Sequence, residues 1–174
     1  FDGIKTSDIQ EILVRSANDL ISLEAPNYQF VAARLLLFGL RKAVYNGHPD
    51  GHPPLKEHVA KCVERGVYDS SILGKYTDEE WEKLSGFMDH DRDYLFTYAG
   101  IRQVVDKYLV QDRSSGQVYE TPQFMYMMIA ATLFQDDDKF YRLEYVKKYY
   151  DAISKHRINI PTPVMAGVRT PLRQ

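Results

Sequence analysis

The sequence has a single cysteine, Cys62, among 174 residues, so no disulfide can form within the chain. This scarcity favours a reducing compartment, and we predict a cytoplasmic protein. No apolar run reaches the roughly 18 residues that span a bilayer, so a membrane protein is not expected. The formal net charge of −2 provides no strongly basic surface, and nucleic acid is not an expected partner.

The composition indicates a folded chain with a substantial core. Hydrophobic residues make up 44% of the sequence and charged residues 26%, as in ordinary globular proteins. The chain begins at Phe1 without a methionine and ends at Gln174 inside an irregular, proline-containing segment. We therefore expect a piece of a larger protein, which would not act alone as an enzyme.

Helical periodicity and capping signals predict a mainly α-helical array. Ser7 with Gln10, and Thr77 with Glu80, have the spacing of a capping box at the start of a helix. A threonine followed by proline at 121–122 is a further start signal. The predicted helices cover approximately residues 7–21, 28–45, 55–65, 77–88, 91–108, 124–134 and 139–155.

Two segments break this helical pattern. Residues 108–110 and 118–120 are strand-like and flank the turn-forming run 112–116, which predicts a short β-hairpin. The run Ile158–Ile160 alternates like a strand, and three prolines follow it. We expect residues 158–174 to form an extended tail without a helix, pairing with something outside the chain; the prolines are Pro161, Pro163 and Pro171.

Clustered acids and histidines suggest metal binding but lack a complete ligand set. The run Asp89–Asp93 (DHDRD) places two aspartates on one face of a predicted helix. The alternative is a set of carboxylates stabilised by the dipole of a helix first turn. His48 and His52, beside Asp50, also lie in a Pro/Gly loop typical of surface histidines. No further His or Cys cluster completes either site, so no metal is expected.

Cys62 and the methionine- and aromatic-rich run 124–128 are better explained by packing. A catalytic thiol requires an electropositive, partly exposed site, whereas Cys62 lies among apolar helix neighbours. The run 124–128 fits a buried helix more simply than a ligand pocket. The sequence has no glycine-rich phosphate loop and no nucleophile elbow. Residue types alone therefore leave the function open.

Six stretches in order along the chain resemble the large subunit of aerobic, class I ribonucleotide reductase. The similarity covers essentially the whole chain and is closest to the enterobacterial and T4-like phage members. The stretches are DGIKTSDIQ (2–10), PNYQFVAARLLLFGLRK (26–42), DHDRD (89–93), KYLVQDR (107–113), YETPQFMYM (119–127) and IPTPVMAGVRTPLRQ (160–174).

The resemblance implies three regions and a missing domain. Residues 1–45 match the end of an ATP-cone domain with a connecting helix, and 46–157 match the all-helical domain. Residues 158–174 match the start of an α/β barrel that holds the active site in this family. The resemblance therefore implies that this chain is a helical scaffold that leads into a barrel outside the chain.

The implied activity is reduction of ribonucleoside diphosphates to deoxyribonucleoside diphosphates by thiyl-radical chemistry. In the family a di-iron partner subunit supplies the radical, and barrel cysteines carry the reaction. Cys62 matches none of those cysteines, so no catalytic residue is expected here. The implied partners are the remainder of the large subunit, the radical-generating small subunit and the substrate.

Three residues match ligand-contacting positions of the family. Thr162 matches a threonine that contacts the nucleoside diphosphate, although a turn between two prolines would also explain it. Thr6 and Lys42 match positions that contact the effector ATP or dATP. Their alternatives are a helix cap for Thr6 and a solvated lysine at a helix C-terminus for Lys42.

A second interpretation remains open, in which the chain is a non-catalytic helical module for interaction or nucleotide sensing. The cone-like region at residues 1–45 makes nucleotide sensing conceivable. The two interpretations differ in whether the gene, or a neighbouring gene, continues into a cysteine-bearing barrel.

Overall fold

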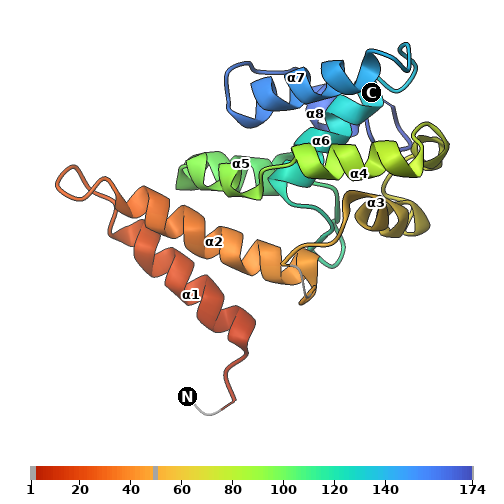
Figure 1. Ribbon diagram of the computed structural model, residues 1–174. Helices are drawn as coiled ribbons and strands as arrows, with labels where there is room; N and C mark the ends of the chain where they lie inside the picture. Colours follow the sequence, from red (N-terminus) through yellow and green to blue (C-terminus); the bar gives the residue numbers. More distant parts are fainter. Residues whose placement is uncertain (1–2, 49–50, 174) are drawn as a thin grey trace.

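The computed structural model describes residues 3–48 and 51–173 (Figure 1). This part of the chain is mainly α-helical with one small antiparallel sheet, which confirms the predicted fold class. The elements are α1 Thr6–Asp19, α2 Tyr28–Tyr45, α3 Leu55–Glu64, the 3-10 helix η1 Ser70–Gly74, α4 Asp78–Phe87, the 3-10 helix η2 His90–Leu95, α5 Tyr98–Lys107, β1 Gln111–Asp112, β2 Gln117–Val118, α6 Pro122–Leu133, α7 Arg142–Ser154 and α8 Thr162–Gly167.

Helix α6 forms the centre of the molecule. Every residue from Pro122 to Ala131 is buried, and α7, η2 and α8 pack against this helix. A helix that is apolar all round is stable only when neighbours surround it. The methionine- and aromatic-rich run 124–128 is therefore core packing, as predicted.

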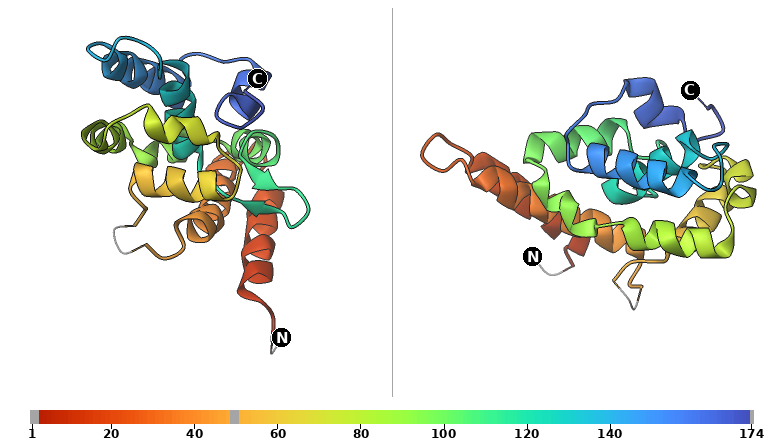
Figure 2. Two further views of the ribbon diagram at one scale, coloured as in Figure 1. Left: turned by 90° about the vertical axis from the view of Figure 1, so that its right-hand side faces the viewer. Right: turned by 45° about the horizontal axis from the view of Figure 1, so that its top comes forward.

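Helices α1 and α2 form an antiparallel hairpin that extends from this body (Figure 2). Only Val14 and Ala17 of α1 are buried, while Ile12 is 53% exposed. Helix α2 is likewise only partly buried, because Phe38 is 64% exposed. The hairpin thus presents uncovered apolar side chains to its surroundings.

The two predicted capping boxes have opposite outcomes. Thr77 accepts a hydrogen bond from the Glu80 backbone N–H at 3.3 Å, and the Glu80 carboxylate accepts one from the Thr77 N–H at 2.8 Å. The Ser7 box is wrong. The Ser7 hydroxyl hydrogen-bonds Asp8, whereas the Gln10 amide donates to the Leu35 carbonyl of α2. A tertiary contact has replaced the local one.

This difference predicts unequal effects of two matched substitutions. Thr77→Ala should lower the free energy of unfolding by about 0.5–2 kcal/mol, because the Glu80 N–H loses its acceptor. Ser7→Ala should change it by less than about 0.5 kcal/mol, since Ser7 caps no backbone donor. Urea denaturation of both variants measures the contrast, and equal losses would contradict it.

The helix predicted over 91–108 is divided in two. Its first half is η2, and Phe96 and Thr97 lie outside both helices. The Asp89 carboxylate caps η2 at the Asp91 N–H, and the Thr97 hydroxyl caps α5 at the Gly100 N–H. Side chains that cap a backbone donor start a new helix at that point, which explains the break. The β-hairpin is confirmed, with Gln111 opposite Val118, but its strands are 111–112 and 117–118 instead of the expected 108–110 and 118–120.

The C-terminal segment differs from the extended tail that we expected. Residues 162–167 form α8, and Ile158–Ile160 is not a strand. Pro161 is the N-cap and Pro163 lies in the first turn, where a helix needs no N–H donor. Val164, Met165 and Val168 pack against the core of this same chain. The prolines therefore begin a helix here instead of preventing one.

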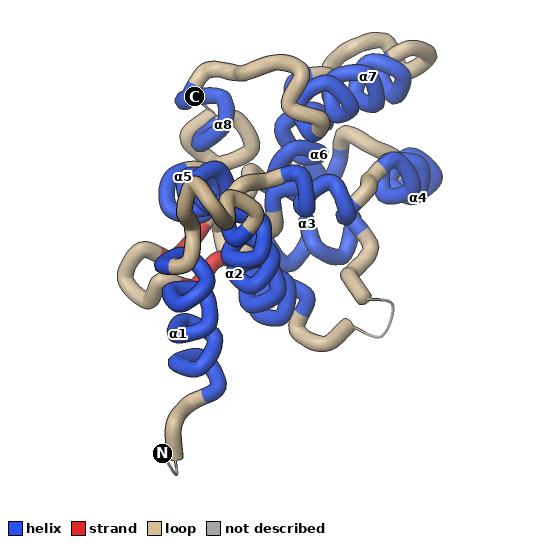
Figure 3. Tube along the Cα trace, turned by 90° about the vertical axis from the view of Figure 1, so that its left-hand side faces the viewer, coloured by secondary structure: helices blue, strands red, loops and turns tan. Residues whose placement is uncertain are grey.

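In residues 3–48 and 51–173, none of the helices combines the length and apolar character required to cross a membrane. Figure 3 shows the small sheet beside α1 and α2 at the base of the hairpin. Val118 of β2 and Leu36, Leu40 and Ala43 of α2 line one cavity with the start of α1.

Candidate functional site

The segment that carries Thr162 is anchored by a buried ion pair. Arg169 follows α8, and Glu120 lies between β2 and α6; both side chains have zero exposure. The Arg169 Nε donates to Glu120 Oε2 at 3.0 Å, and its second nitrogen donates to Glu120 Oε1. This forked geometry gives a short, directional bond between a guanidinium and a carboxylate.

Further hydrogen bonds satisfy both members of this pair. Arg169 also donates to the carbonyls of Met165 at 2.6 Å and Tyr108 at 2.9 Å. Glu120 accepts from the Val110 N–H at 2.8 Å and from the Tyr68 hydroxyl. Burial raises the pKa of Tyr68 well above its usual value, and the Glu120 charge adds to that effect. One ion pair thus connects the end of α5, the β-hairpin formed by β1 and β2, and α8.

Thr162 is the first residue of α8, and its side chain is exposed. Hydrogen bonding with Thr162 is the main cause of a lowered pKa at the Tyr108 phenol. Tyr108 also lines a cavity of about 530 Å³ between α5 and the segment leading into α8. Gln103, Asn159 and Met165 share that cavity. Thr162 therefore stands on an accessible edge, beside a hydroxyl that borders a cavity.

Thr6 and Lys42 lie on neighbouring helices of the hairpin. Thr6 is the exposed first residue of α1, and Lys42 is exposed in the last turn of α2. Lys42 lines a groove of about 640 Å³ with Arg34, Arg41, Phe38 and others. Thr6 is outside that groove, and no contact described for the resolved ranges joins it to Lys42. α8 lies at the opposite end of the molecule from α1 (Figure 1).

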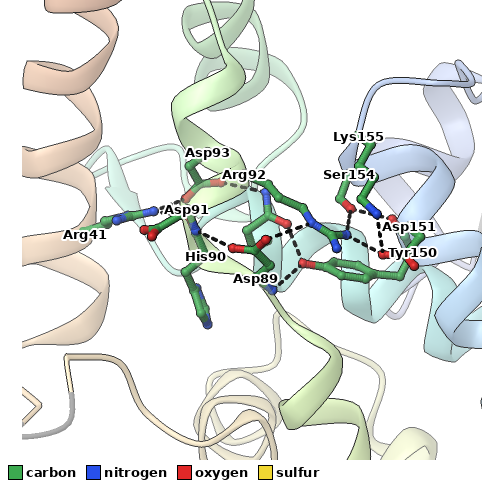
Figure 4. Close-up of polar contacts among 11 residues, drawn as sticks. Arg41, Asp89, His90, Asp91, Arg92, Asp93, Tyr150, Asp151, Ser154 and Lys155 are labelled. Atoms are coloured by element: carbon green, nitrogen blue, oxygen red, sulfur yellow. Dashed lines mark hydrogen bonds and ion pairs between the residues drawn. The ribbon is translucent and has the colours of Figure 1, made fainter.

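The DHDRD run joins three helices to one another (Figure 4). Arg92 contacts Asp151 at 2.7 Å and Ser154 at 2.7 Å, both on α7. Asp93 accepts from Arg41 of α2 at 3.2 Å and from Gln123 of α6 at 2.9 Å. The run fastens the α1–α2 hairpin to the body of the fold.

These contacts do not form a metal site. Asp89 binds Arg92 on one side of η2, while Asp93 binds Arg41 on another, so the expectation of one shared face is wrong. In the described ranges, no three His, Cys, Asp or Glu residues are grouped to hold a metal ion. The rings of His52 and His90 are stacked, with their centroids 3.9 Å apart. Asp50 lies outside the described residues.

Burial shifts the ionisation of the groups around this run. The pKa of Asp93 is raised to about 6, mainly by burial, with Gln123 and Arg41 opposing the shift. The pKa of His90 is lowered to about 3, again mainly by burial. His90 is therefore a neutral ring near pH 7, and it hydrogen-bonds the Tyr45 hydroxyl at 2.9 Å.

Cys62 is a packing residue, as predicted. The side chain is 1% exposed and contacts His58 Nε2 at 3.6 Å. Burial, followed by the charge of Glu120, raises the pKa of the thiol to about 12. The neighbouring His58 has a pKa lowered to about 3, so neither group is charged near pH 7. A neutral, enclosed thiol is a poor nucleophile.

Comparison with known proteins shows which proteins this chain is similar to. Residues 94–173 match the family described as "Ribonucleotide reductase, all-alpha domain". In those residues the chain is similar to a ribonucleotide reductase all-alpha domain. Over 174 residues it is 51% identical to the ribonucleoside-diphosphate reductase 1 subunit alpha of Escherichia coli (strain K12). It is 47% identical over 173 residues to the corresponding subunit alpha of Enterobacteria phage T4.

These matches cover the whole chain but only part of each relative. The chain spans 23% of the E. coli protein and 22% of the T4 protein. The Haemophilus influenzae subunit alpha is matched in the same way, at 51% identity and 23% of its length. The resemblance to the ribonucleotide reductase large subunit that the six stretches suggested is confirmed.

Sequence reasoning missed the residues that hold this helical domain together. Glu120 and Arg169 are separated by 48 intervening positions and carry no local pattern that links them. Arg41 and Asp93 are also remote in sequence. The available signal was chemical: a charged residue inside an otherwise apolar segment, such as Glu120 before α6, requires a buried partner.

Proposed function

We propose that this chain is part of the large subunit of a ribonucleoside-diphosphate reductase. The complete subunit reduces ribonucleoside diphosphates to deoxyribonucleoside diphosphates by thiyl-radical chemistry. The chain contributes a helical scaffold and one edge of the substrate site. Its divisions would be the end of an ATP cone at 1–45, the helical domain at 46–157 and the barrel entry at 158–174.

The observation that carries this proposal is similarity along the whole chain to subunits alpha, at up to 51% identity. The chemistry of the residues agrees with a scaffold role. Cys62 is enclosed and neutral, which disfavours it as a radical or redox thiol. The catalytic cysteines would therefore lie in the remainder of the subunit, and a di-iron small subunit would supply the radical.

Thr162 would contact the nucleoside diphosphate from the first turn of α8. Its exposed side chain and its position beside the cavity at Tyr108 support this role. Lys42 and Thr6 would contact an ATP or dATP effector. The exposed Lys42 ammonium has the charge that a phosphate requires. We place the assembled enzyme in the cytoplasm.

Complementation tests the proposal. The isolated chain should reduce no CDP in the presence of a dithiol reductant and the radical subunit. Adding the cysteine-bearing remainder of the large subunit should produce dCDP. Reduction by the isolated chain would contradict the scaffold role, and failure of a correctly associated mixture would favour the non-catalytic module.

A further inference from the structure

We propose that Arg169 and Glu120 are positioning residues that set the place of Thr162 at the substrate edge. This inference rests on the proposed function, since it concerns the residue assigned there to substrate contact. Arg169 does not touch the substrate in this proposal. It acts through the backbone of α5 and α8.

The contacts form a closed loop around Thr162. Arg169 donates to the Tyr108 carbonyl at 2.9 Å and to the Met165 carbonyl at 2.6 Å. Met165 lies in α8, three positions after Thr162, and the Tyr108 side chain interacts with Thr162 directly. One guanidinium therefore fixes the two backbone segments whose side chains meet at Thr162.

Glu120 holds the guanidinium in the required orientation. Its two oxygens accept hydrogen bonds from two nitrogens of Arg169. The carboxylate also accepts hydrogen bonds from the Val110 N–H and the Tyr68 hydroxyl, which fix its own position. All the side chains in this group are fully or almost fully buried. A planar fork bound on several sides has little freedom to rotate. Lysine could keep the charge, but its single nitrogen cannot make the four hydrogen bonds that Arg169 makes from three nitrogens.

A short α8 needs such an anchor. The helix has six residues, fewer than an isolated helix requires for stability. Its preceding segment, 158–161, contains no regular structure. Without the Arg169 contacts, Thr162 would occupy a range of positions, and substrate affinity would fall while the remote chemistry stayed the same.

The test uses the complete large subunit with its radical subunit and measures kcat and KM for CDP. Arg169→Lys should raise KM about tenfold and leave kcat within about twofold, which corresponds to about 1.4 kcal/mol of binding. The double variant Glu120→Gln/Arg169→Met repeats the test without a buried charge. It provides the measurement if Arg169→Lys does not fold. Arg102→Lys, in an exposed ion pair of 2.9 Å with Asp106, is the matched control and should change neither constant.

A double-variant cycle separates positioning from general destabilisation. Tyr108→Phe removes the hydroxyl beside Thr162 and should also raise KM. Combined with Arg169→Lys, it should add little, because both changes act on Thr162. A folded Arg169 variant with unchanged KM, or fully multiplicative effects in the cycle, would overturn the inference. Thr162→Val tests the proposed function separately. An unchanged KM for that variant would show that Thr162 does not contact the substrate.

Discussion

Replacing Arg169 with methionine is expected to lower the free energy of unfolding by about 3–5 kcal/mol. The substitution leaves the Glu120 carboxylate with zero exposure and no cation beside it. An unpaired charge in the interior is far more costly than a lost surface contact. Exposed pairs such as Lys148–Glu144 should contribute less than about 1 kcal/mol by comparison.

The companion variant identifies the origin of this loss. Glu120→Gln/Arg169→Met removes both charges and keeps a side-chain acceptor for the Val110 N–H. It should recover more than half of the stability lost in Arg169→Met, since the buried charge is then absent. The fluorescence of Trp81, the single tryptophan and 1% exposed, follows unfolding in urea. Equal stability of the single and double variants would show that the charge is not the cause.

Acidification is expected to destabilise the protein through His58. Its pKa is lowered to about 3 from an ordinary value of 6.5, chiefly by burial and then by electrostatic interaction with His90, Lys61 and Arg65. The unfolded chain therefore binds a proton below pH 6.5 that the folded chain does not. The contribution of this site to stability falls by up to about 1.4 kcal/mol for each pH unit, or about 2.3 kcal/mol between pH 6.5 and 4.5.

His58→Gln isolates this contribution. The glutamine cannot titrate, so the wild-type protein should lose about 2–3 kcal/mol more than the variant between pH 6.5 and 4.5. His90 titrates in both proteins and cancels in the comparison. The His58 ring stacks on the Phe124 ring, with their centroids 3.8 Å apart. Loss of this stacking lowers the stability of the variant equally at all pH values. Between pH 7 and 8 the difference should be constant, and parallel curves at every pH would contradict the assignment.

The sequence predicts the elements whose signals are local. The range of α2 agrees at both ends, and Asn46 adopts the left-handed conformation expected after a helix C-terminus. The Thr77–Glu80 box and Pro122 mark the starts of α4 and α6 correctly. In each case the residues that mark the helix end lie within a few positions of it.

Apart from the break between η2 and α5, which local caps explain, the errors arise where distant contacts decide the outcome. Gln10 donates to Leu35 instead of closing a capping box, and α8 forms where packing against the core supports a helix of six residues. The partners of Asp93 lie 52 and 30 positions away. Pattern reasoning over short windows cannot find such pairs, because their spacing depends on the completed fold.

The candidate site shows the same division. Thr162, Thr6 and Lys42 came from resemblance to a family, because isolated threonines and lysines have no diagnostic spacing. The structure adds Tyr108 beside Thr162 and a groove beside Lys42. The absence of a reactive environment at Cys62 was visible from its apolar neighbours, and its burial confirms that interpretation.

A chimeric large subunit tests the central claim most directly. This chain would replace the 174-residue segment that it matches in the E. coli subunit alpha, with which it shares 51% identity. Assayed with the E. coli radical subunit and a dithiol reductant, the chimera should convert CDP to dCDP, and Thr162→Val within it should raise KM. A folded chimera that associates with the radical subunit but forms no dCDP would contradict the account.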